Sequence, residues 1–342
     1  MVPQTLLSPR SAALTGEMFP VEYSTLSCEA LVQRVLSRYS LAPILACRLW
    51  NRGLSDVYLV ETRNCHYILR VSHAHWRTQS EIEFELSFLD CLRQNDLPVA
   101  YPLITRGGQL SIEISAPEGR RYAALFLHAP GEIPLCDLSI DQAQGLGQTL
   151  ARIHQATPQF RPTCFRQPLT VEYLLDRSLE EILPFFGHQP EEQDYLNGLR
   201  SQLFASLSSL SQDEPYWVVC WGDPHSGNVH FTPDGNLTLF DFDQCGYGWR
   251  SFDIAKFFQT SLRTGMSYAM RRAFLEGYES VSPLEDWELL ALSDLVQVAH
   301  IWGWGIRLRA AQVHSYSQLD STYFRQRLHQ LKSFRQQNWQ LI

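Results

Sequence analysis

Apolar and polar residues follow two patterns along the chain, and the pattern changes near residue 131. Before that point, short apolar runs bounded by turn residues predict strands rather than helices. Two runs lie within residues 47–60, joined by a polar turn at Gly53, and three more lie at residues 66–71, 109–115 and 122–127. The first part of the chain therefore predicts a five-stranded antiparallel sheet.

Apolar residues at intervals of three and four predict helices in the rest of the chain. The expected helices begin after Ser27, a helix-capping residue, and span residues 81–92, 141–156, 171–183, 193–210, 251–262, 269–278, 287–309 and 323–339. Residues 1–24 mix proline and glycine with scattered apolar groups, which is typical of an extended lead-in. The pattern predicts an α+β protein with a lead-in over residues 1–24, a mixed region over 25–130 and a helical region over 131–342.

Carboxylates and an amide occur at close intervals between apolar runs in residues 217–253. Residues 217–220 and 236–240 are predicted as short buried strands, separated by a hairpin turn at residues 233–235. Polar residues then lie where the strands end, in the pattern of a site that binds a metal and phosphates.

Asp223, Asn228 and Asp241 have the residue types and spacing that phosphoryl transfer requires. That reaction needs a carboxylate to receive the proton of the acceptor hydroxyl, and oxygen ligands that hold magnesium against the nucleotide phosphates. Asn228 follows Asp223 by five residues, and Asp241 opens an Asp-Phe-Asp sequence after the hairpin. Turn-forming preferences explain isolated Asp and Asn residues, but they do not explain this whole set.

The run Asp223-Pro224-His225-Ser226-Gly227-Asn228, together with Asp241-Phe242-Asp243, resembles the aminoglycoside phosphotransferase and choline kinase family. These proteins are small-molecule relatives of the protein kinases. The resemblance implies a bilobal, protein-kinase-like fold in which residues 25–130 form the N-lobe and residues 131–342 form a helical C-lobe. It also implies that ATP and Mg²⁺ bind between the lobes and that the C-lobe holds the catalytic loop and the acceptor pocket.

Carried over by motif position, the resemblance assigns Asp223 as the catalytic base and Asn228 and Asp241 as magnesium ligands. Asp243 replaces the glycine of the kinase Asp-Phe-Gly motif and is expected to assist in binding metal or substrate. Asp253 is expected to be structural, because its counterpart in the family hydrogen-bonds the catalytic loop. The chain has Trp221 where the family usually has histidine, and tryptophan cannot accept a hydrogen bond.

The resemblance also implies nucleotide-binding residues in the N-lobe. Ser55, in the turn between the first two strands, is expected to reach a phosphate. Arg70 occupies the position of the phosphate-gripping lysine of kinases. Its helix partner is chosen from Glu81, Glu83 and Glu85, and aligning the interval to Pro98 with the family selects Glu85.

The end of the fifth predicted strand is expected to form the hinge that meets the adenine base. Phe126 and His128 lie there, and His128 is interpreted as a hinge surface residue rather than a catalyst. Four residues of the penultimate helix are candidate walls of the acceptor pocket, although an aromatic stripe on a helix more often belongs to a core. They are Trp302, Trp304, Arg307 and Arg309.

Composition narrows the class of protein. Hydrophobic residues make up 45% of the chain and aromatic residues 12%, which is typical of a globular protein. The net charge of -8 argues against nucleic acid as a partner, because phosphate backbones call for concentrated positive charge. No run of eighteen apolar residues predicts a membrane span, and no signal-peptide pattern is present, so a cytoplasmic location is expected.

The eight cysteines are scattered and form no Cys-x-x-Cys pair, which favours free thiols in a reducing compartment. His225 and His230 lie five residues apart, but no further ligands with zinc spacing accompany them. The sequence leaves the oligomeric state open.

Three hypotheses about activity remain at this point. The first is an ATP- and Mg²⁺-dependent kinase of a small-molecule hydroxyl, with amino alcohols, homoserine, sugars and aminoglycosides as acceptors in the family. The second is a Ser/Thr protein kinase, against which the short interval between Asp243 and Asp253 leaves no obvious activation segment. The third is a nucleotide-binding pseudokinase, motivated by Trp221 and Arg70.

Overall fold

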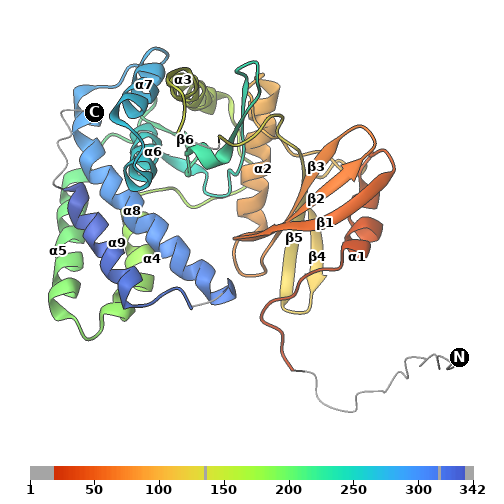
Figure 1. Ribbon diagram of the computed structural model, residues 1–342, viewed down its shortest axis with the longest axis horizontal. Helices are drawn as coiled ribbons and strands as arrows, with labels where there is room; N and C mark the ends of the chain where they lie inside the picture. The colour runs from red at the N-terminus through yellow and green to blue at the C-terminus, as the bar shows by residue number, and fades with distance from the viewer. Residues whose placement is uncertain (1–18, 135–136, 315–316, 336–342) are drawn as a thin grey trace, which may run out of the picture.

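The computed structural model describes residues 19–134, 137–314 and 317–335, so most of the expected lead-in lies outside the described residues. The N-terminal region contains a five-stranded antiparallel sheet in the order β1-β2-β3-β5-β4 (Figure 1). Its strands are β1 (Ile44–Arg52), β2 (Ser55–Thr62), β3 (His66–Ser72), β4 (Ile112–Ala116) and β5 (Gly119–Leu127). The predicted five-stranded antiparallel sheet is confirmed.

Two helices accompany the sheet, α1 (Cys28–Arg34) and α2 (Gln79–Gln94). Ser27 caps α1 as expected, and Thr78 begins α2 in a reciprocal capping box with Glu81. Alternate residues of β5 belong to two different hydrophobic clusters, one shared with α1 and one shared with α2. The sheet is therefore buried on both faces, and Figure 1 shows α2 between the sheet and the helical region.

The rest of the described chain is mainly helical. Its long helices are α3 (Ile140–Ala156), α4 (Val171–Ile182), α5 (Pro190–Leu207), α6 (Arg250–Thr264), α7 (Tyr268–Glu279), α8 (Asp286–His314) and α9 (Ser321–Phe334). Helix α8 packs against α4 and α6, and α3 packs against α7. The apolar face of α2 joins the same core, which fastens the sheet to the helices. The expected helices are confirmed, while the predicted end of the last one, beyond residue 335, lies outside the described residues.

Helix α8 has the length and apolar composition of a membrane span between Asp286 and Ala311. Its most apolar stretch, however, is 67% buried inside the protein. Because neighbouring helices cover it, α8 is the central core helix of the helical region.

Two small antiparallel sheets hold the polar loops in place. Strand β6 (Trp217–Cys220) pairs with β9 (Gly246–Trp249), and β7 (Val229–Phe231) pairs with β8 (Leu237–Leu239). The turn at residues 233–235 therefore joins β7 to β8, whereas the sequence pattern placed it between the strands at 217–220 and 236–240. The apolar pattern does not reveal β7 and β9, because His230 interrupts β7 and two of the four residues of β9 are glycines, which are rare in strands.

Candidate active site

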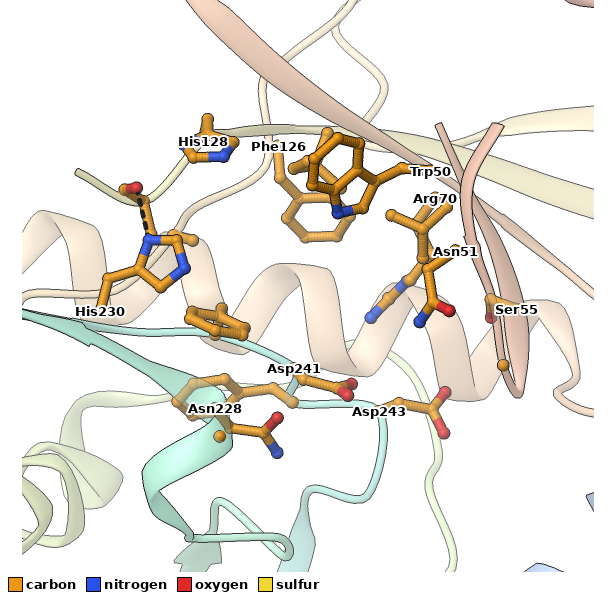
Figure 2. Close-up of a pocket in the computed structure, with 18 of the residues that line it drawn as sticks. Trp50, Asn51, Ser55, Arg70, Phe126, His128, Asn228, His230, Asp241 and Asp243 are labelled. Carbon is orange, nitrogen blue, oxygen red and sulfur yellow. Dashed lines mark hydrogen bonds between the residues drawn. The ribbon is translucent and has the colours of Figure 1, made fainter. Parts of the chain in front are cut away.

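A cavity of about 540 Å³ lies between the sheet and the helical region. Figure 2 shows side chains from both regions around it. From the sheet come Trp50, Asn51, Ser55, Arg70 and Phe126, and from the polar loops come Asn228, His230, Asp241 and Asp243. Every residue predicted to bind nucleotide or metal lines this cavity, including Glu85 and His128.

Arg70 on β3 and Glu85 on α2 form a bidentate ion pair at the back of this cavity. The Nη1 atom of Arg70 donates to Oε1 of Glu85 at 2.8 Å, and Nη2 donates to Oε2 at 2.6 Å. Glu85 is buried, and its charge raises the pKa of Arg70 above the usual value even though burial opposes this. The other two candidate glutamates have different partners, since Glu81 caps α2 and Glu83 accepts from Gln79. Arg70 is thereby held as a rigid cation that faces the cavity.

Aromatic rings line the hinge side of the same cavity. The guanidinium of Arg70 lies 4.8 Å from the centre of the Phe126 ring. The His128 ring contacts the rings of His66 and His230. Burial and the charge of His230 lower the pKa of His128. His230 also bonds the carbonyl of Ala129 through Nδ1, as the dashed line in Figure 2 marks. This flat, apolar end of the cavity has the shape and chemistry for a planar base.

Asp253 at the start of α6 positions the loop that carries Asp223. Its carboxylate accepts the backbone N–H groups of Trp221 at 2.6 Å and Gly222 at 2.8 Å. Gly222 has a φ of +86°, and a Cβ there would lie 2.1 Å from the carbonyl oxygen of Gln244, so only glycine fits. The structural role predicted for Asp253 is confirmed by these bonds.

Trp221 braces the loop in a different way from the histidine that the family usually has there. It is fully buried, stacks on Phe242, and donates its indole N–H to the carbonyls of Phe240 and Asp241 at 3.1 Å. An indole can only donate, and these two carbonyls are acceptors. The substitution therefore comes with partners of matching chemistry and ties the Asp223 loop to the Asp241 segment.

His154, Cys220 and Asp253 come close enough together to suggest a buried metal site. Each has protein partners instead. The thiol of Cys220 bonds the Trp249 carbonyl, and His154 lies between Tyr278 and Asp253. Since Asp253 already accepts two backbone N–H groups, we assign this cluster to bracing the catalytic loop.

Asp223 has two cationic or proton-bearing neighbours. Its Oδ1 lies 3.2 Å from Nζ of Lys256 on α6, and its Oδ2 lies 3.5 Å from Nε2 of His225. The Nδ1 atom of His225 accepts from the Gly227 N–H, so its Nε2 carries the proton. Although burial alone would raise it, these neighbours, Lys256 first, hold the pKa of Asp223 well below its usual range.

Asn228 and Asp241 present oxygen atoms to the first cavity. Asn228 donates its Nδ2 to the Asp223 carbonyl at 3.1 Å, which leaves its side-chain oxygen available. Asp241 has a φ of +60°, an uncommon conformation for a residue other than glycine. Desolvation and the charge of Asp243 raise the pKa of the Asp241 carboxylate to about 6, although the charge of Arg70 opposes this change. In the described part of the chain, no side chain donates a hydrogen bond to the Asp241 carboxylate.

Asp243 is engaged by the segment between β3 and α2. Its carboxylate accepts from the indole of Trp76 at 2.9 Å and from Arg77 at 3.1 Å, and its carbonyl accepts from Arg77 and Arg166. Although burial opposes the change, the charges of Arg77 and Arg70 hold the pKa of Asp243 well below its usual range. Both of its oxygens therefore have protein partners, and the predicted metal role of Asp243 competes with these bonds.

A second cavity of about 580 Å³ adjoins the first, and Asp223 lies in its wall. Gly53 and Leu54, in the turn between β1 and β2, border both cavities. Of the four residues proposed for the acceptor wall, Trp302 and Arg307 line this cavity. Trp304 is instead buried in the core, and Arg309 lies against the rings of Trp76 and Trp302.

The sequence analysis missed several charged residues around these cavities, including Lys256, Arg77, Arg263 and Arg327. One of them had a signal in the sequence. Lys256 is one of two lysines in the chain, and it stands alone among the apolar residues of α6. A charge inside an apolar helical run that follows Asp253 marks a residue whose partner must lie nearby.

The comparisons with known proteins agree with this geometry. Residues 47–293 match the model of the phosphotransferase enzyme family. An uncharacterised protein of Synechocystis is 49% identical over 98% of this chain and 92% of its own length. The amicoumacin kinase of Bacillus subtilis is 24% identical over 73% of this chain and 76% of its own length.

Solved structures share the fold at low sequence identity. An amicoumacin kinase in complex with AMP-PNP, Ca²⁺ and its ligand has a TM-score of 0.76 and 22% identity, covering 89% of this chain and 93% of its own. A microcompartment-associated aminopropanol kinase has a TM-score of 0.71 and 21% identity, covering 90% and 95%. The kinase-like fold expected from the motifs is thereby confirmed. The chain belongs to the phosphotransferase enzyme family, in which a phosphoryl group is transferred to a hydroxyl group.

Proposed function

We propose that this protein transfers the γ-phosphoryl group of ATP to a hydroxyl group of a small molecule, with Mg²⁺ as the required ion. One observation carries the proposal. Asp223 lies in the wall of the second cavity, which adjoins the first cavity with Arg70, Asn228 and Asp241. The two cavities share the β1–β2 turn. Two substrates in these cavities would meet beside the proposed base.

The residues around Asp241 fit a divalent cation. Carboxylate and amide oxygens are the ligands that Mg²⁺ uses beside substrate phosphates. Besides desolvation, the negative charges of Asp243, Asp223 and Glu85 raise the pKa of Asp241, and a bound cation would offset those charges. We assign Asn228 and Asp241 as its protein ligands. Bound Mg²⁺ would neutralise phosphate charge as it develops in the transition state.

The chain's own residues then have separate tasks in the reaction. Arg70, oriented by Glu85, grips phosphate oxygens, and Phe126 with the hinge backbone at His128 encloses the base. The acceptor oxygen forms a bond to the γ-phosphorus while the bond to the β–γ bridging oxygen breaks, and ADP leaves with that electron pair. Asp223 receives the hydroxyl proton, and Ser55 at the start of β2, directly after the β1–β2 turn, contacts the phosphates.

Asp223→Asn tests the assignment of the base. Purified protein would be incubated with Mg-ATP and a panel of amino alcohols, sugars, aminoglycosides, hydroxy acids and a generic protein, with ADP release as the readout. We expect turnover with one small-molecule class and its reduction by about 100-fold or more in Asp223→Asn. Thermal stabilisation by Mg-ATP should persist in this variant, because the base does not line the first cavity.

Asp234→Asn, an exposed aspartate in the β7–β8 turn, is the matched control and should keep full activity. Unchanged turnover in Asp223→Asn would contradict the assignment. Stabilisation by Mg-ATP with no turnover of any acceptor would instead favour the pseudokinase, and phosphate on the generic protein would favour the protein kinase. The relatives named as kinases of amicoumacin and aminopropanol support the small-molecule alternative.

A further inference from the structure

The second cavity is strongly basic, although the whole chain carries a net charge of -8. Its charged lining comprises five cations and one carboxylate in the described part of the chain. The carboxylate is Asp223, and the cations are Arg52, Lys256, Arg263, Arg307 and Arg327. A cavity lined by one sign of charge concentrates ligands of the opposite sign.

Two of these cations already have carboxylate partners. Lys256 is paired with Asp223, and Nε of Arg52 lies 3.7 Å from Asp56. Arg263, Arg307 and Arg327 differ, because no described carboxylate lies within ion-pair distance of them. Among the described residues, the side-chain acceptor of Arg307 is the neutral amide of Gln318, and Arg327 lies over the ring of Tyr323.

These residues project from three helices into one space. Lys256, Gln259, Thr260 and Arg263 recur at helical intervals on α6, so they form one face of that helix. Helix α8, which packs against α6 and α9, adds His300 and Arg307, and α9 adds Arg327. Lys256 and Gln259 are buried and Arg263 is exposed, so this polar face of α6 lines a cavity that is open to solvent.

The arginines are close enough to affect one another. Burial and the like charge of Arg327 lower the pKa of Arg263. His300, in the same cavity, has its pKa lowered to about 3 by burial and by Arg327, Lys256 and Arg263, so it stays neutral. Asp223 attracts Arg263 from the same cavity wall, but the arginines still repel one another, and an anion bound between them would offset that repulsion.

We propose that the phosphoryl acceptor is an alcohol that also carries a carboxylate or phosphate group, which Arg263, Arg307 and Arg327 bind. This inference rests on the proposed kinase activity, which makes the second cavity the acceptor site. Guanidinium groups bind the oxygens of carboxylates and phosphates bidentately, so both kinds of acid are suitable. A cationic acceptor such as an aminoglycoside would face repulsion from the same three groups. The nucleotide phosphates have their own cation, Arg70, in the first cavity.

Compounds that present similar hydroxyl groups with different charges test the proposal. Gluconate, glucose 6-phosphate, glucose and glucosamine form one set, and glycerate, glycerol 3-phosphate, glycerol and 3-amino-1,2-propanediol form another. At constant ionic strength we expect kcat/KM for the best acid of a set to exceed that of its neutral and cationic counterparts at least tenfold. Comparing the carboxylates with the phosphates then identifies which acid the arginines select.

Arg263→Gln and Arg327→Gln connect the preference to these side chains. Loss of one charge-assisted contact should raise KM for the acid about tenfold while KM for ATP stays the same. Arg325→Gln is the matched control, because Arg325 is exposed and lies two residues before Arg327 on α9. It should leave both KM values unchanged. Higher kcat/KM for a neutral or cationic compound would overturn the inference and leave the kinase assignment intact.

A binding measurement does not depend on turnover. In the presence of Mg-ADP, the acids should raise Tm of the wild type more than glucose or glucosamine do, and the double variant Arg263→Gln/Arg327→Gln should lose that difference. Equal shifts in wild type and double variant would overturn the anion site. If Mg-ADP and Mg-ATP gave no stabilisation while selective binding of the acids persisted, the kinase function would fail and the anion site would stand.

Discussion

At the scale of single residues, the charge beside Asp223 governs the pH at which this carboxylate can take up a proton. Lys256 lies 3.2 Å away and is the main cause of the low pKa. Removal of this charge should raise the pKa of Asp223, so activity should begin to fall at a higher pH as the solution is made more acidic.

The corresponding variant is Lys256→Met. We expect kcat to fall roughly 10- to 100-fold, and the acid limb of the pH–rate profile to move to higher pH, because a misplaced and more basic carboxylate is protonated earlier. Lys256→Arg should recover part of the activity, and Lys332→Met, at the exposed second lysine, should behave as wild type. An acid limb identical in wild type and Lys256→Met would show that Lys256 does not act through Asp223.

A second prediction at this scale concerns Trp221. Trp221→Phe keeps an aromatic ring on Phe242 but removes the donor for the Phe240 and Asp241 carbonyls. We expect the free energy of unfolding to fall by roughly 1–3 kcal/mol, from the lost bonds and the smaller ring, together with a lower kcat. Urea unfolding measures the first quantity. Trp287→Phe is the control, since no described acceptor receives its indole N–H. An equal loss of unfolding free energy in Trp287→Phe and Trp221→Phe would show that the two hydrogen bonds of Trp221 have no special stabilising role.

At the scale of elements, an ion pair ties β2 to β5. Arg121 donates to Oδ2 of Asp56 at 2.7 Å, and both side chains are fully buried. Tyr23 donates to the other oxygen, which anchors the segment before α1 to the same pair. Burial alone would raise the pKa of Asp56, but His73, Tyr23 and Arg121 lower it to about 2.

This pair predicts how the sheet responds to acid. A carboxyl group with a lower pKa in the folded state stabilises the fold above its ordinary pKa, and this stabilisation is lost as pH falls from about 4 toward 2. Asp56→Asn should remove this part of the pH dependence and destabilise the protein at pH 7 by roughly 3 kcal/mol, because the buried Arg121 would lose its carboxylate partner at 2.7 Å and keep only Glu118 at 3.5 Å. Denaturant unfolding between pH 2 and 7 measures both effects. If the slope below pH 4 were the same in wild type and Asp56→Asn, another carboxyl group would be responsible.

Helix α6 shows how one element can serve two parts of the site. Its first turn carries Asp253, which positions the catalytic loop through two backbone bonds. Its next turns carry Lys256 and Arg263 toward the second cavity. Because both functions share one rigid helix, a shift of α6 would move the proposed base and the proposed acceptor wall together.

At the scale of the whole molecule, the sequence predicted the features that depend on residues close together along the chain. Asp223, Asn228 and Asp241 lie within one stretch, so their spacing indicated a common site. The sheet and the long helices have clear periodicity, whereas His230 interrupts the apolar residues of β7 and half of β9 is glycine. The pairing of Arg70 with Glu85 required the family resemblance, because three glutamates of α2 had suitable positions.

Contacts between distant segments could not be predicted in this way. Arg77 reaches Asp243 from the segment before α2, and Arg327 reaches the second cavity from α9. Periodicity describes one element at a time and contains no information on which faces meet. The net negative charge of the chain gave no indication of the basic cavity, because a local electric field depends on a few nearby residues rather than on the net charge.

Gly53 and Leu54 border the first cavity, proposed for the nucleotide, on one side and the second cavity, proposed for the acceptor, on the other. A ligand that orders this turn from one side therefore spares the second ligand part of the entropic cost of ordering it. By thermodynamic reciprocity, the factor by which nucleotide tightens acceptor binding must equal the factor by which acceptor tightens nucleotide binding. In the proposed reaction the two substrates are thus coupled through the β1–β2 turn that borders both cavities, in addition to their contact at the transferred phosphoryl group.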